Sequence, residues 1–582
     1  MKRGTLLIAL VVLCVMGIAA CGSSHHHVTP IATNNFVFYV SGEDATFNAY
    51  SLVGVVTITA DGNNTITGGI QDFNDGDGLT SPQLPAPGGD TILAAGSSLS
   101  FNPDGSGNAL LTLATSNTAL GNGGTETFAL SFANPSHALI SQFDGTATSA
   151  GSYDLQTLPS APIASTSFSF TSTGVDAEFD PIVEGGVITL DASGNVTSSV
   201  DINDGGDVTL GNSASVGTVI PASDTSGRGT VTGSIDGTGA VVNFYIVNSE
   251  VIRLIDVDTT DTAVGSAYGQ GATAGSFSPA SIGQSAFYIA GLTDFYNGAG
   301  QFFTTVDGDD AKPKSNKRPA RPQGELPACT GSPCAFEGTA DVNETVEEGA
   351  VGSGVFDGTY VLAGNGYGSF SFVDPPNDSD LATFGIYAVD PTLNILDPNN
   401  PLTPAPNGIT SALIAEMDSN LVGTGALIPQ VALPVVSDIA ADVVFNAQGN
   451  AAEDEALQEF DLLGASSVDA GVFSGEGFFD DPAGIFGDGT AILDPNSTFS
   501  ATFTDDGTNI GRYLSGDGGF VATSPAAAVS IDFTATAYDA NGDQLFWVEM
   551  DDGSTWGGSI QASTFTVPDA KKAQAKPRTK SK

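Results

Sequence analysis

The sequence predicts an all-β protein built from tandem antiparallel β modules, and its composition is the first observation behind that prediction. Of its 582 residues, 73 are Gly and 34 are Phe, whereas only 14% are charged. Helices favour Lys, Glu, Gln and Leu, while strands favour β-branched and aromatic residues and tight turns favour Gly. The composition therefore indicates strands joined by short turns.

The second observation is the pattern of polar and apolar residues around these turns. Apolar and polar residues alternate through Gly54–Thr59, turn at Asp61–Asn63, and alternate again from Thr65 to Phe73. A Gly-containing turn between two alternating runs is the strongest short-range signal for a β-hairpin. The chain repeats this pattern, which predicts a series of hairpins.

The third observation is one stretch that recurs four times. Each copy has an apolar run that ends in Asp, a short polar turn, a Gly, and a second extended run that ends in Gln. We interpret it as the closing hairpin of a module, and the interval between copies far exceeds the roughly 20–50 residues of a solenoid repeat, so the chain holds four complete modules. The copies are Ala138–Asp144 with Gly151 and Gln156, Val251–Asp256 with Gly265 and Gln270, Ala412–Asp418 with Gly425 and Gln430, and Leu545–Asp551 with Gly557 and Gln561.

The module boundaries follow from these hairpins and from the extended runs that precede them. Each module holds about eight such runs, which suits a small β domain. In module 3 a hairpin turn is expanded into a basic, Pro-rich insert, and such an expansion costs little closure entropy. In module 4, Ala451–Phe460 is predicted to hold a helical turn or two. The predicted bounds are 35–160 for module 1, 161–283 for module 2, 284–430 for module 3 with its insert at 309–335, and 431–567 for module 4.

Short turns between the runs predict the arrangement of strands within a module. Neighbouring strands must then be antiparallel, which favours an up-and-down meander. Closure into a small, lipocalin-like barrel removes exposed strand edges, so a closed barrel is the predicted fold of each module. A two-sheet β-sandwich is the alternative. Whether the modules fold singly, or two of them share a larger barrel, stays open.

The first twenty residues are predicted to be a signal peptide. Lys2-Arg3 forms a basic start, an apolar stretch runs from Leu6 to Ile18, and two small residues follow it. An apolar stretch of this length is too short to span a membrane as a mature helix. The segment 21–34 is then expected to be a tether between the processed end and module 1.

The end of the signal peptide, Ile18-Ala19-Ala20-Cys21, matches the lipobox of bacterial lipoproteins at every position. With its repeats, the chain resembles the tandem-repeat, all-β surface lipoproteins of bacteria, many of which have no known activity. The resemblance implies that Cys21 receives a diacylglyceryl group, is labelled by palmitate, and anchors the protein in a membrane. Gly22 stands where an inner-membrane retention signal has Asp, which implies the outer membrane or cell surface. An ordinary secretory signal that contains a Cys is the alternative.

The charge distribution limits the possible partners. The formal net charge is -50, with 66 acidic and 16 basic residues. Most basic residues lie in the signal peptide, in the insert and in the tail at 568–582, which leaves Arg228, Arg253 and Arg512 for the folded modules. Such a body repels anionic polymers, which excludes nucleic acid as its partner. The tail is predicted to be disordered. It is either a solubilising end or a segment that associates with acidic faces of the same or a neighbouring molecule, or with anionic envelope polymers, through salt-sensitive contacts.

Cysteine and histidine usage predicts a disulfide and argues against catalysis. Cys329 and Cys334 remain after the signal and lipid cysteines are set aside, and in an oxidising compartment they are expected to form a local disulfide. Outside the tether the sole histidine is His137, at the head of a predicted strand, where a packed or solvated ring is expected. No nucleophile, phosphate or zinc motif is present. The chain is therefore predicted to have no catalytic residues and not to be an enzyme.

Calcium is the one cofactor that the sequence suggests, and only as a weakly bound ion. The oxygen-rich stretch Asp72, Asn74, Asp75 and Asp77 supplies candidate ligands but does not fit an EF-hand register. Hairpin turns explain most Asp-Gly pairs equally well. The predicted function is a structural or adhesive role as a lipid-anchored envelope protein. The alternative is a binding protein that holds a small apolar or glycan ligand inside its barrels, and interior volume separates the two.

Overall fold

A computed structural model describes residues 33–566, with gaps in that range. The gaps are 47, 61–62, 77–87, 160–166, 214–215, 222–224, 234–240, 258, 260, 292–295, 305–332, 345–351, 374–380, 403–407, 420, 431–434, 454–455, 482–491, 508, 510, 526–528 and 552–553. The predicted signal peptide, nearly all of the tether, most of the insert and the basic tail lie outside the described residues.

The chain folds into four closed, eight-stranded antiparallel barrels in tandem, which confirms the predicted all-β fold of barrel modules. Barrels 1 and 3 close in simple up-and-down order. In barrels 2 and 4 a ninth strand pairs outside the ring, β12 on β11 and β31 on β30, while β10–β11 and β29–β30 pairing completes closure. Among the described residues, no helix is long and apolar enough to cross a bilayer.

The strands follow one another in chain order. Barrel 1 consists of β1 (Thr33–Asp44), β2 (Ala49–Thr59), β3 (Ile66–Asp75), β4 (Asp90–Phe101), β5 (Asn108–Thr115), β6 (Thr125–Asn134), β7 (His137–Gln142) and β8 (Ala147–Leu155). Barrel 2 consists of β9 (Ser167–Asp176), β10 (Pro181–Leu190), β11 (Asn195–Asp204), β12 (Asp207–Asn212), β13 (Val216–Pro221), β14 (Arg228–Gly233), β15 (Val242–Ile246), β16 (Val251–Asp256) and β17 (Asp261–Gly269).

The second half of the chain repeats this plan. Barrel 3 consists of β18 (Ser285–Gly291), β19 (Tyr296–Thr304), β20 (Cys334–Glu344), β21 (Gly352–Leu362), β22 (Tyr367–Val373), β23 (Leu381–Ala388), β24 (Ala412–Glu416) and β25 (Gly423–Pro429). Barrel 4 consists of β26 (Asp442–Glu453), β27 (Ala456–Asp469), β28 (Val472–Asp481), β29 (Ile492–Asp505), β30 (Arg512–Ser524), β31 (Val529–Phe533), β32 (Ala535–Asp539), β33 (Gln544–Glu549) and β34 (Ser554–Ala562). Single-turn 3-10 helices η1 (Gly271–Thr273), η2 (Pro279–Ser281) and η3 (Val436–Asp438) lie between barrels.

Two predicted boundaries and one predicted element differ from the structure. β1 begins at Thr33, inside the predicted tether 21–34, and β20 begins at Cys334, inside the predicted insert 309–335. The helical turn expected in Ala451–Phe460 is wrong, because β26 and β27 form a long hairpin there and pair as far as Glu453 with Ala456. Cross-strand pairing in a closed barrel outweighs the local helix propensity of Ala, Glu and Leu.

In barrels 1, 2 and 3, the Gly of the recurring hairpin allows the barrel to close. A Cβ on Gly151 would lie 1.9 Å from the carbonyl oxygen of Tyr39 on β1, and one on Gly425 would lie 1.9 Å from that of Tyr288 on β18. The last strand of these barrels therefore approaches the first at a distance that only Gly permits. In barrel 4 the neighbouring Gly558 takes this place, with a Cβ that would lie 2.2 Å from the carbonyl oxygen of Asn446.

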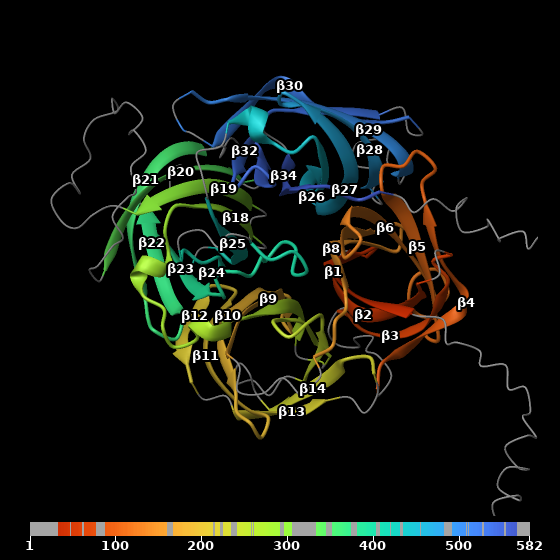
Figure 1. Ribbon diagram of the computed structural model, residues 1–582, viewed down its shortest axis with the longest axis horizontal. Coiled ribbons are helices and arrows are strands. Elements are labelled where there is room, and N and C mark those ends of the chain that lie inside the picture. The colour runs from red at the N-terminus through yellow and green to blue at the C-terminus, as the bar shows by residue number, and fades with distance from the viewer. Residues whose placement is uncertain are drawn as a thin grey trace, which may run out of the picture.

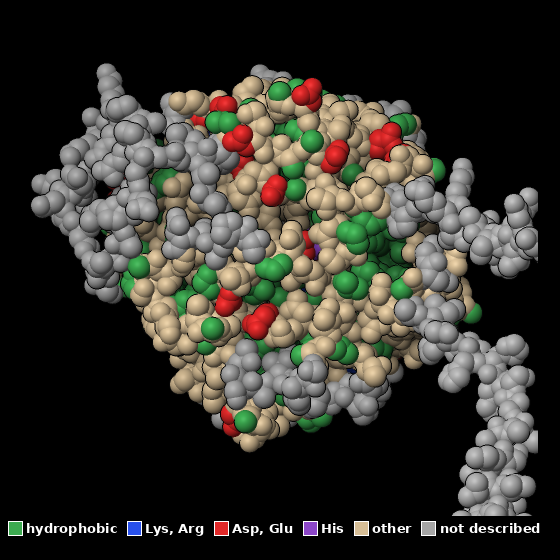
Figure 2. Space-filling view, viewed as in Figure 1, with side chains coloured by type: hydrophobic (Ala, Val, Ile, Leu, Met, Phe, Trp, Pro, Cys, Tyr) green, Lys and Arg blue, Asp and Glu red, His purple; other side chains and the backbone are tan. Residues whose placement is uncertain are grey.

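The four barrels are arranged in a ring (Figure 1). The opening strands of each barrel pack on the closing hairpin of the next, and β26 and β27 of barrel 4 pack on β6, β7 and β8 of barrel 1. Each barrel has its own apolar interior. A fifth core, with residues from all four barrels, fills the centre of the ring. Acidic side chains are scattered over the face shown in Figure 2, with no single acidic patch.

Candidate functional site at the barrel junctions

Many of the buried polar residues in the described part of the chain lie where one barrel meets the next. We name these contacts junctions 1/2, 2/3, 3/4 and 4/1, after the barrels that they join. At the first three, one buried Asp occupies the same register position on the third strand of the earlier barrel, and these are Asp72, Asp201 and Asp341. We call them the junction acids.

At junction 1/2 the junction acid holds an arginine and a tyrosine of barrel 2. Arg228 donates from Nε to Oδ2 of Asp72 at 2.6 Å and from Nη2 to Oδ1 at 2.9 Å. The hydroxyl of Tyr245 donates to Oδ2 at 2.8 Å. Arg228 and Tyr245 are directly opposite each other on β14 and β15, so the sheet of barrel 2 presents them as one unit. Asp72 is fully buried, and both its oxygens are satisfied.

Junction 3/4 repeats this arrangement with a second carboxylate. Arg512 donates from Nε to Oδ2 of Asp341 at 2.8 Å and from Nη2 to Oδ1 at 2.7 Å, and Tyr538 also donates to Asp341. Nη1 of Arg512 donates to Oδ2 of Asp506, 3.0 Å away. Arg512 and Tyr538 are again opposite each other, on β30 and β32.

At junction 2/3, no cation among the described residues faces the junction acid. The hydroxyls of Tyr367 and Tyr387, which are opposite each other on β22 and β23, donate to Oδ1 and Oδ2 of Asp201 at 2.5 and 2.8 Å. Burial raises the pKa of Asp201, and the two tyrosine hydroxyls, with the backbone N–H of Gly211 that donates to Oδ1 at 2.7 Å, only partly offset that effect. Neutral phenol donors stabilise the ionised form of a carboxyl group less than an Arg does, so Asp201 ionises less readily than an acid paired with Arg.

Junction 4/1 replaces the junction acid with an apolar contact. Phe478 stands at the register position of the junction acids, opposite Leu463. Its ring packs edge-on against that of Phe143, with 5.3 Å between centroids. Both rings belong to a small core shared by barrels 4 and 1.

The Gln that ends each recurring hairpin reaches the next barrel, so these glutamines are junction residues at all four contacts. Gln156 Nε2 donates to the carbonyl oxygens of Ser226 and Ile246, each at 2.7 Å. The other three contacts are Gln270 to the carbonyls of Asn365 and Ala388, Gln430 to the carbonyl of Asp539, and Gln561 to His137. The last of these runs from barrel 4 to barrel 1 and completes the ring.

A buried charged network joins barrels 1, 2 and 4. Asp154 Oδ1 lies 2.7 Å from Nδ1 of His137, and Asp154 Oδ2 accepts from Nη2 of Arg253 at 2.6 Å. Nε2 of His137 lies 3.1 Å from Oε1 of Gln561. The guanidinium of Arg253 also lies over the Tyr39 ring, 4.5 Å from its centroid, in a cation–π contact.

The electrostatics of this network favour its charged form. Burial raises the pKa of Asp154, but Arg253 and His137 outweigh that effect and hold it at about 2. Burial lowers the pKa of His137, but the hydrogen bond and charge of Asp154 outweigh it, so the net pKa is above the ordinary value. With both ring nitrogens engaged and the ring fully buried, His137 has no free nitrogen for a substrate. The Asp–His pair thus acts as a structural contact.

No known protein family matches this chain, and neither does any curated protein sequence. Function therefore has to be argued from the contacts and cavities of the molecule itself. Inside barrel 2 a cavity of about 30 Å³, lined by residues such as Phe170, Ile182 and Leu254, has room for roughly one water. On the outer face of barrel 4 an open groove of about 410 Å³ crosses β28, β29 and β30, and its lining includes Ser474, Thr498, Ser500 and Thr523.

The structure places the predicted calcium ligands at junction 1/2. Asp72 holds Arg228, while Nδ2 of Asn74 donates to the carbonyl of Asp261 at 2.8 Å. Asp75 ends β3, and Asp77 lies outside the described residues. Asp72 and Asn74 are thus used as protein contacts. In the described part of the chain, no group of three or more His, Cys, Asp or Glu side chains is arranged to hold a metal ion.

Of the three cysteines predicted to be modified or paired, the structure describes only Cys334. Cys21 and Cys329 lie outside the described residues, so lipidation and the disulfide stay predictions. Cys334 opens β20 and is fully buried in the core of barrel 3.

Sequence reasoning missed the junctions, although one signal was available. The whole chain has 66 acids, whereas the folded modules have only three arginines. Each of these arginines joins two barrels, through Asp72, Asp154 or Asp341.

Proposed function

We propose that this protein is a lipid-anchored structural or adhesive component of the bacterial cell envelope, with no catalytic activity. The observation that carries the proposal is the joining of four filled barrels into one ring by buried polar contacts. Such a body has little internal freedom and is suited to holding outward-facing loops in fixed relative positions.

The filled interiors support this role over that of a binding protein with a ligand inside its barrels. Phe38, Phe73 and Phe128 are fully buried within barrel 1, and the cavity in barrel 2 holds about 30 Å³. Ligand pockets for small molecules commonly measure about 300–1,000 Å³. Interiors filled in this way favour the structural role over a ligand held inside the barrel, because such a ligand would require large repacking.

The anchoring half of the proposal rests on the lipobox and is tested with radiolabelled palmitate. Cells that express the wild-type chain should incorporate label into the protein and retain it in the envelope fraction. The Cys21→Ser variant should take up no label and be released. Equal labelling of both proteins, or free release of the wild type, would refute the anchor.

The structural half is tested on purified full-length protein without the signal peptide. Native mass spectrometry should give the mass of the polypeptide alone, and beads coated with the protein should attach to isolated envelopes. Uncoated beads and beads coated with heat-unfolded protein are the controls. A copurifying small molecule of defined mass would favour the ligand-binding alternative, and attachment no better than that of the control beads would argue against adhesion.

A further inference from the structure

Junction 4/1 carries a carboxyl group where the other junctions carry an amide. By strand register, Asp480 of barrel 4 occupies the position of Asn74, Asn203 and Asn343 in the other barrels. Each of those amides donates to backbone carbonyls of the closing hairpin in the next barrel. A carboxyl group can donate a hydrogen bond only when it is protonated. Asp480 can therefore replace the amide only in its protonated form.

Asp480 is paired with a second buried acid. Asp461 is directly opposite it on β27, and each residue is 1% exposed. None of the four oxygens of these two carboxyl groups makes a hydrogen bond of ordinary length and angle, although the backbone of Ser149 on β8 lies close enough to Asp461 to offset part of the effect of burial on its pKa. Two adjacent, buried and unpartnered carboxylates repel each other and carry a large desolvation cost, which protons remove.

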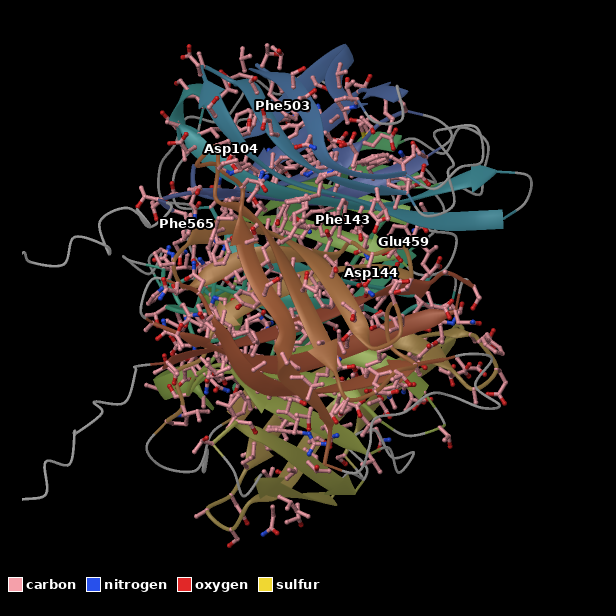
Figure 3. The ribbon with its side chains drawn as sticks, turned by 90° about the vertical axis from the view of Figure 1, so that its right-hand side faces the viewer. Asp104, Phe143, Asp144, Glu459, Phe503 and Phe565 are labelled. Atoms are coloured by element: carbon pink, nitrogen blue, oxygen red, sulfur yellow. The ribbon has the colours of Figure 1, made fainter. Side chains whose placement is uncertain are left out.

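Further acids from both barrels surround this pair. Glu459, on the same face of β27 as Asp461, lies so close to β1 that a Cβ on Gly42 would stand 2.8 Å from its Oε1. Glu43 on β1 has a buried Oε2 without a partner. Asp144 lies in the turn between β7 and β8 of barrel 1. Figure 3 shows Asp144 and Glu459 on the same side of this junction, away from Phe565.

No basic side chain is left to neutralise the cluster within the described residues. The three arginines there are held by Asp72, Asp154 and Asp341. The other titratable groups on the strands around the cluster are also acids or phenols, except for His137 at the opposite end of the junction. They include Tyr39 and Asp44 on β1, Tyr50 on β2, Glu126 on β6, Tyr153 and Asp154 on β8, Asp469 on β27, and Glu476 and Asp481 on β28.

The direction of the pKa shifts agrees with this geometry. Burial, and then the charge of Asp461, raises the pKa of Asp480 and that of Glu459. Burial raises the pKa of Asp461 to about 8 and that of Glu43 to about 7. An acid whose pKa is raised in the folded state contributes stability below its unfolded value, near 4, and loses it as pH rises through the folded value. The pH window is therefore about 4 to 8.

We propose that junction 4/1 is a pH-dependent contact in the ring. Asp461 and Asp480 hold barrels 4 and 1 together when both acids are protonated, and the contact between the barrels weakens when they ionise. His137 acts in the same direction, because its pKa is also raised and its charged contact with Asp154 is lost at high pH. The arginines at junctions 1/2 and 3/4 keep their charge throughout this range. Alkaline conditions thus open the ring at one defined contact. This proposal is independent of the lipid anchor.

The test measures amide hydrogen exchange of the full chain between pH 5.5 and 8.5, corrected for intrinsic exchange. Some groups stay protonated only while the junction is closed. For each of them, opening becomes about tenfold more favourable with every unit by which the pH rises, until the pH reaches the folded pKa of the group. Peptides from β7–β8 and β27–β28 should therefore lose about 100-fold or more of their protection, while those from β16–β17 keep theirs.

Two substitutions exchange residues between equivalent junction positions. Asp480→Asn installs the amide of the other barrels and should remove at least about tenfold of the pH-dependent loss at junction 4/1. Asn74→Asp should create a comparable loss at junction 1/2. Asp461→Asn serves as a second variant, with circular dichroism at pH 5.5 as the check on folding, and Asp104→Asn in an exposed turn is the matched control.

Two results would overturn the proposal. One is an unchanged pH profile in both Asp480→Asn and Asp461→Asn. The other is recovery of wild-type protection at pH 8.5 on addition of CaCl2, reversed by EDTA and absent in Asp480→Asn, because a cation and not a proton would then neutralise the cluster.

Discussion

The three junction acids allow one substitution to be compared in three surroundings. Asp72→Asn removes the charge that faces Arg228, whose side chain is 12% exposed and has no second carboxylate in its ion pair. Breaking a buried ion pair by removing one partner costs about 3–5 kcal/mol, because the other charge stays buried. We therefore expect about 3–5 kcal/mol at junction 1/2.

The other two junctions should lose less. In Asp341→Asn, Arg512 keeps Asp506 at 3.0 Å, so we expect about 2–3 kcal/mol. In Asp201→Asn no cation is left unpaired, and an amide oxygen still accepts from a tyrosine hydroxyl, so we expect about 1 kcal/mol. The predicted order of cost is Asp72, then Asp341, then Asp201.

The assay is the local opening free energy from hydrogen exchange at pH 7 in the full chain. A cost of about 1.4 kcal/mol corresponds to a tenfold loss of protection. Protection of the strands at the junction should therefore fall by about 150-fold or more in Asp72→Asn, by about 30- to 150-fold in Asp341→Asn, and by about 5-fold in Asp201→Asn. The double variant Asp72→Leu/Arg228→Met should recover most of the first loss, because it leaves no buried charge. Equal losses in all three single variants, or no recovery in the double variant, would refute the reasoning.

Three further outcomes are expected. Burial raises the pKa of Glu126 to about 7, so the cost of a buried carboxylate arises only when this group ionises. Glu126→Gln should therefore stabilise barrel 1 at pH 8 by up to about 3 kcal/mol and leave its stability unchanged at pH 4, and urea midpoints at both pH values check this. Gly151→Ala should lower the melting temperature of the whole chain, because its Cβ would lie 1.9 Å from the Tyr39 carbonyl oxygen, whereas Gly516→Ala, where a Cβ meets nothing within 4 Å, should not. Deletion of 568–582 should reduce self-association in sedimentation at low salt and have no effect at high salt; identical sedimentation at low salt would contradict the role of the tail.

The sequence alone determined the all-β class, most of the strands and turns, and the count of four modules. The closing hairpins were the clearest signal, and the structure shows why: β7, β16, β24 and β33 are buried along their whole length. One face of each strand lines its own barrel, and the other packs against neighbouring barrels or the central core. A strand buried on both faces needs a continuous apolar run, and such a run is visible without any tertiary information.

The terminal Gln of each hairpin was equally visible, but its role was not. Its partner lies in the next barrel, and for Gln561 that partner is His137, 424 positions earlier in the chain. Local patterns encode backbone geometry and burial, which depend on neighbours in sequence. They carry no information on which distant side chain completes a hydrogen bond.

Only the tertiary structure decided that four similar modules close into a ring and that their junctions differ. Asp72 and Asp480 are both acids near the end of a third strand, and the sequence treats them alike. Packing places an arginine against Asp72 and another carboxyl group against Asp480. The charge state of a buried acid is set by the groups that surround it in space, so the same residue type is an ion-pair partner at one junction and a proton-dependent contact at another.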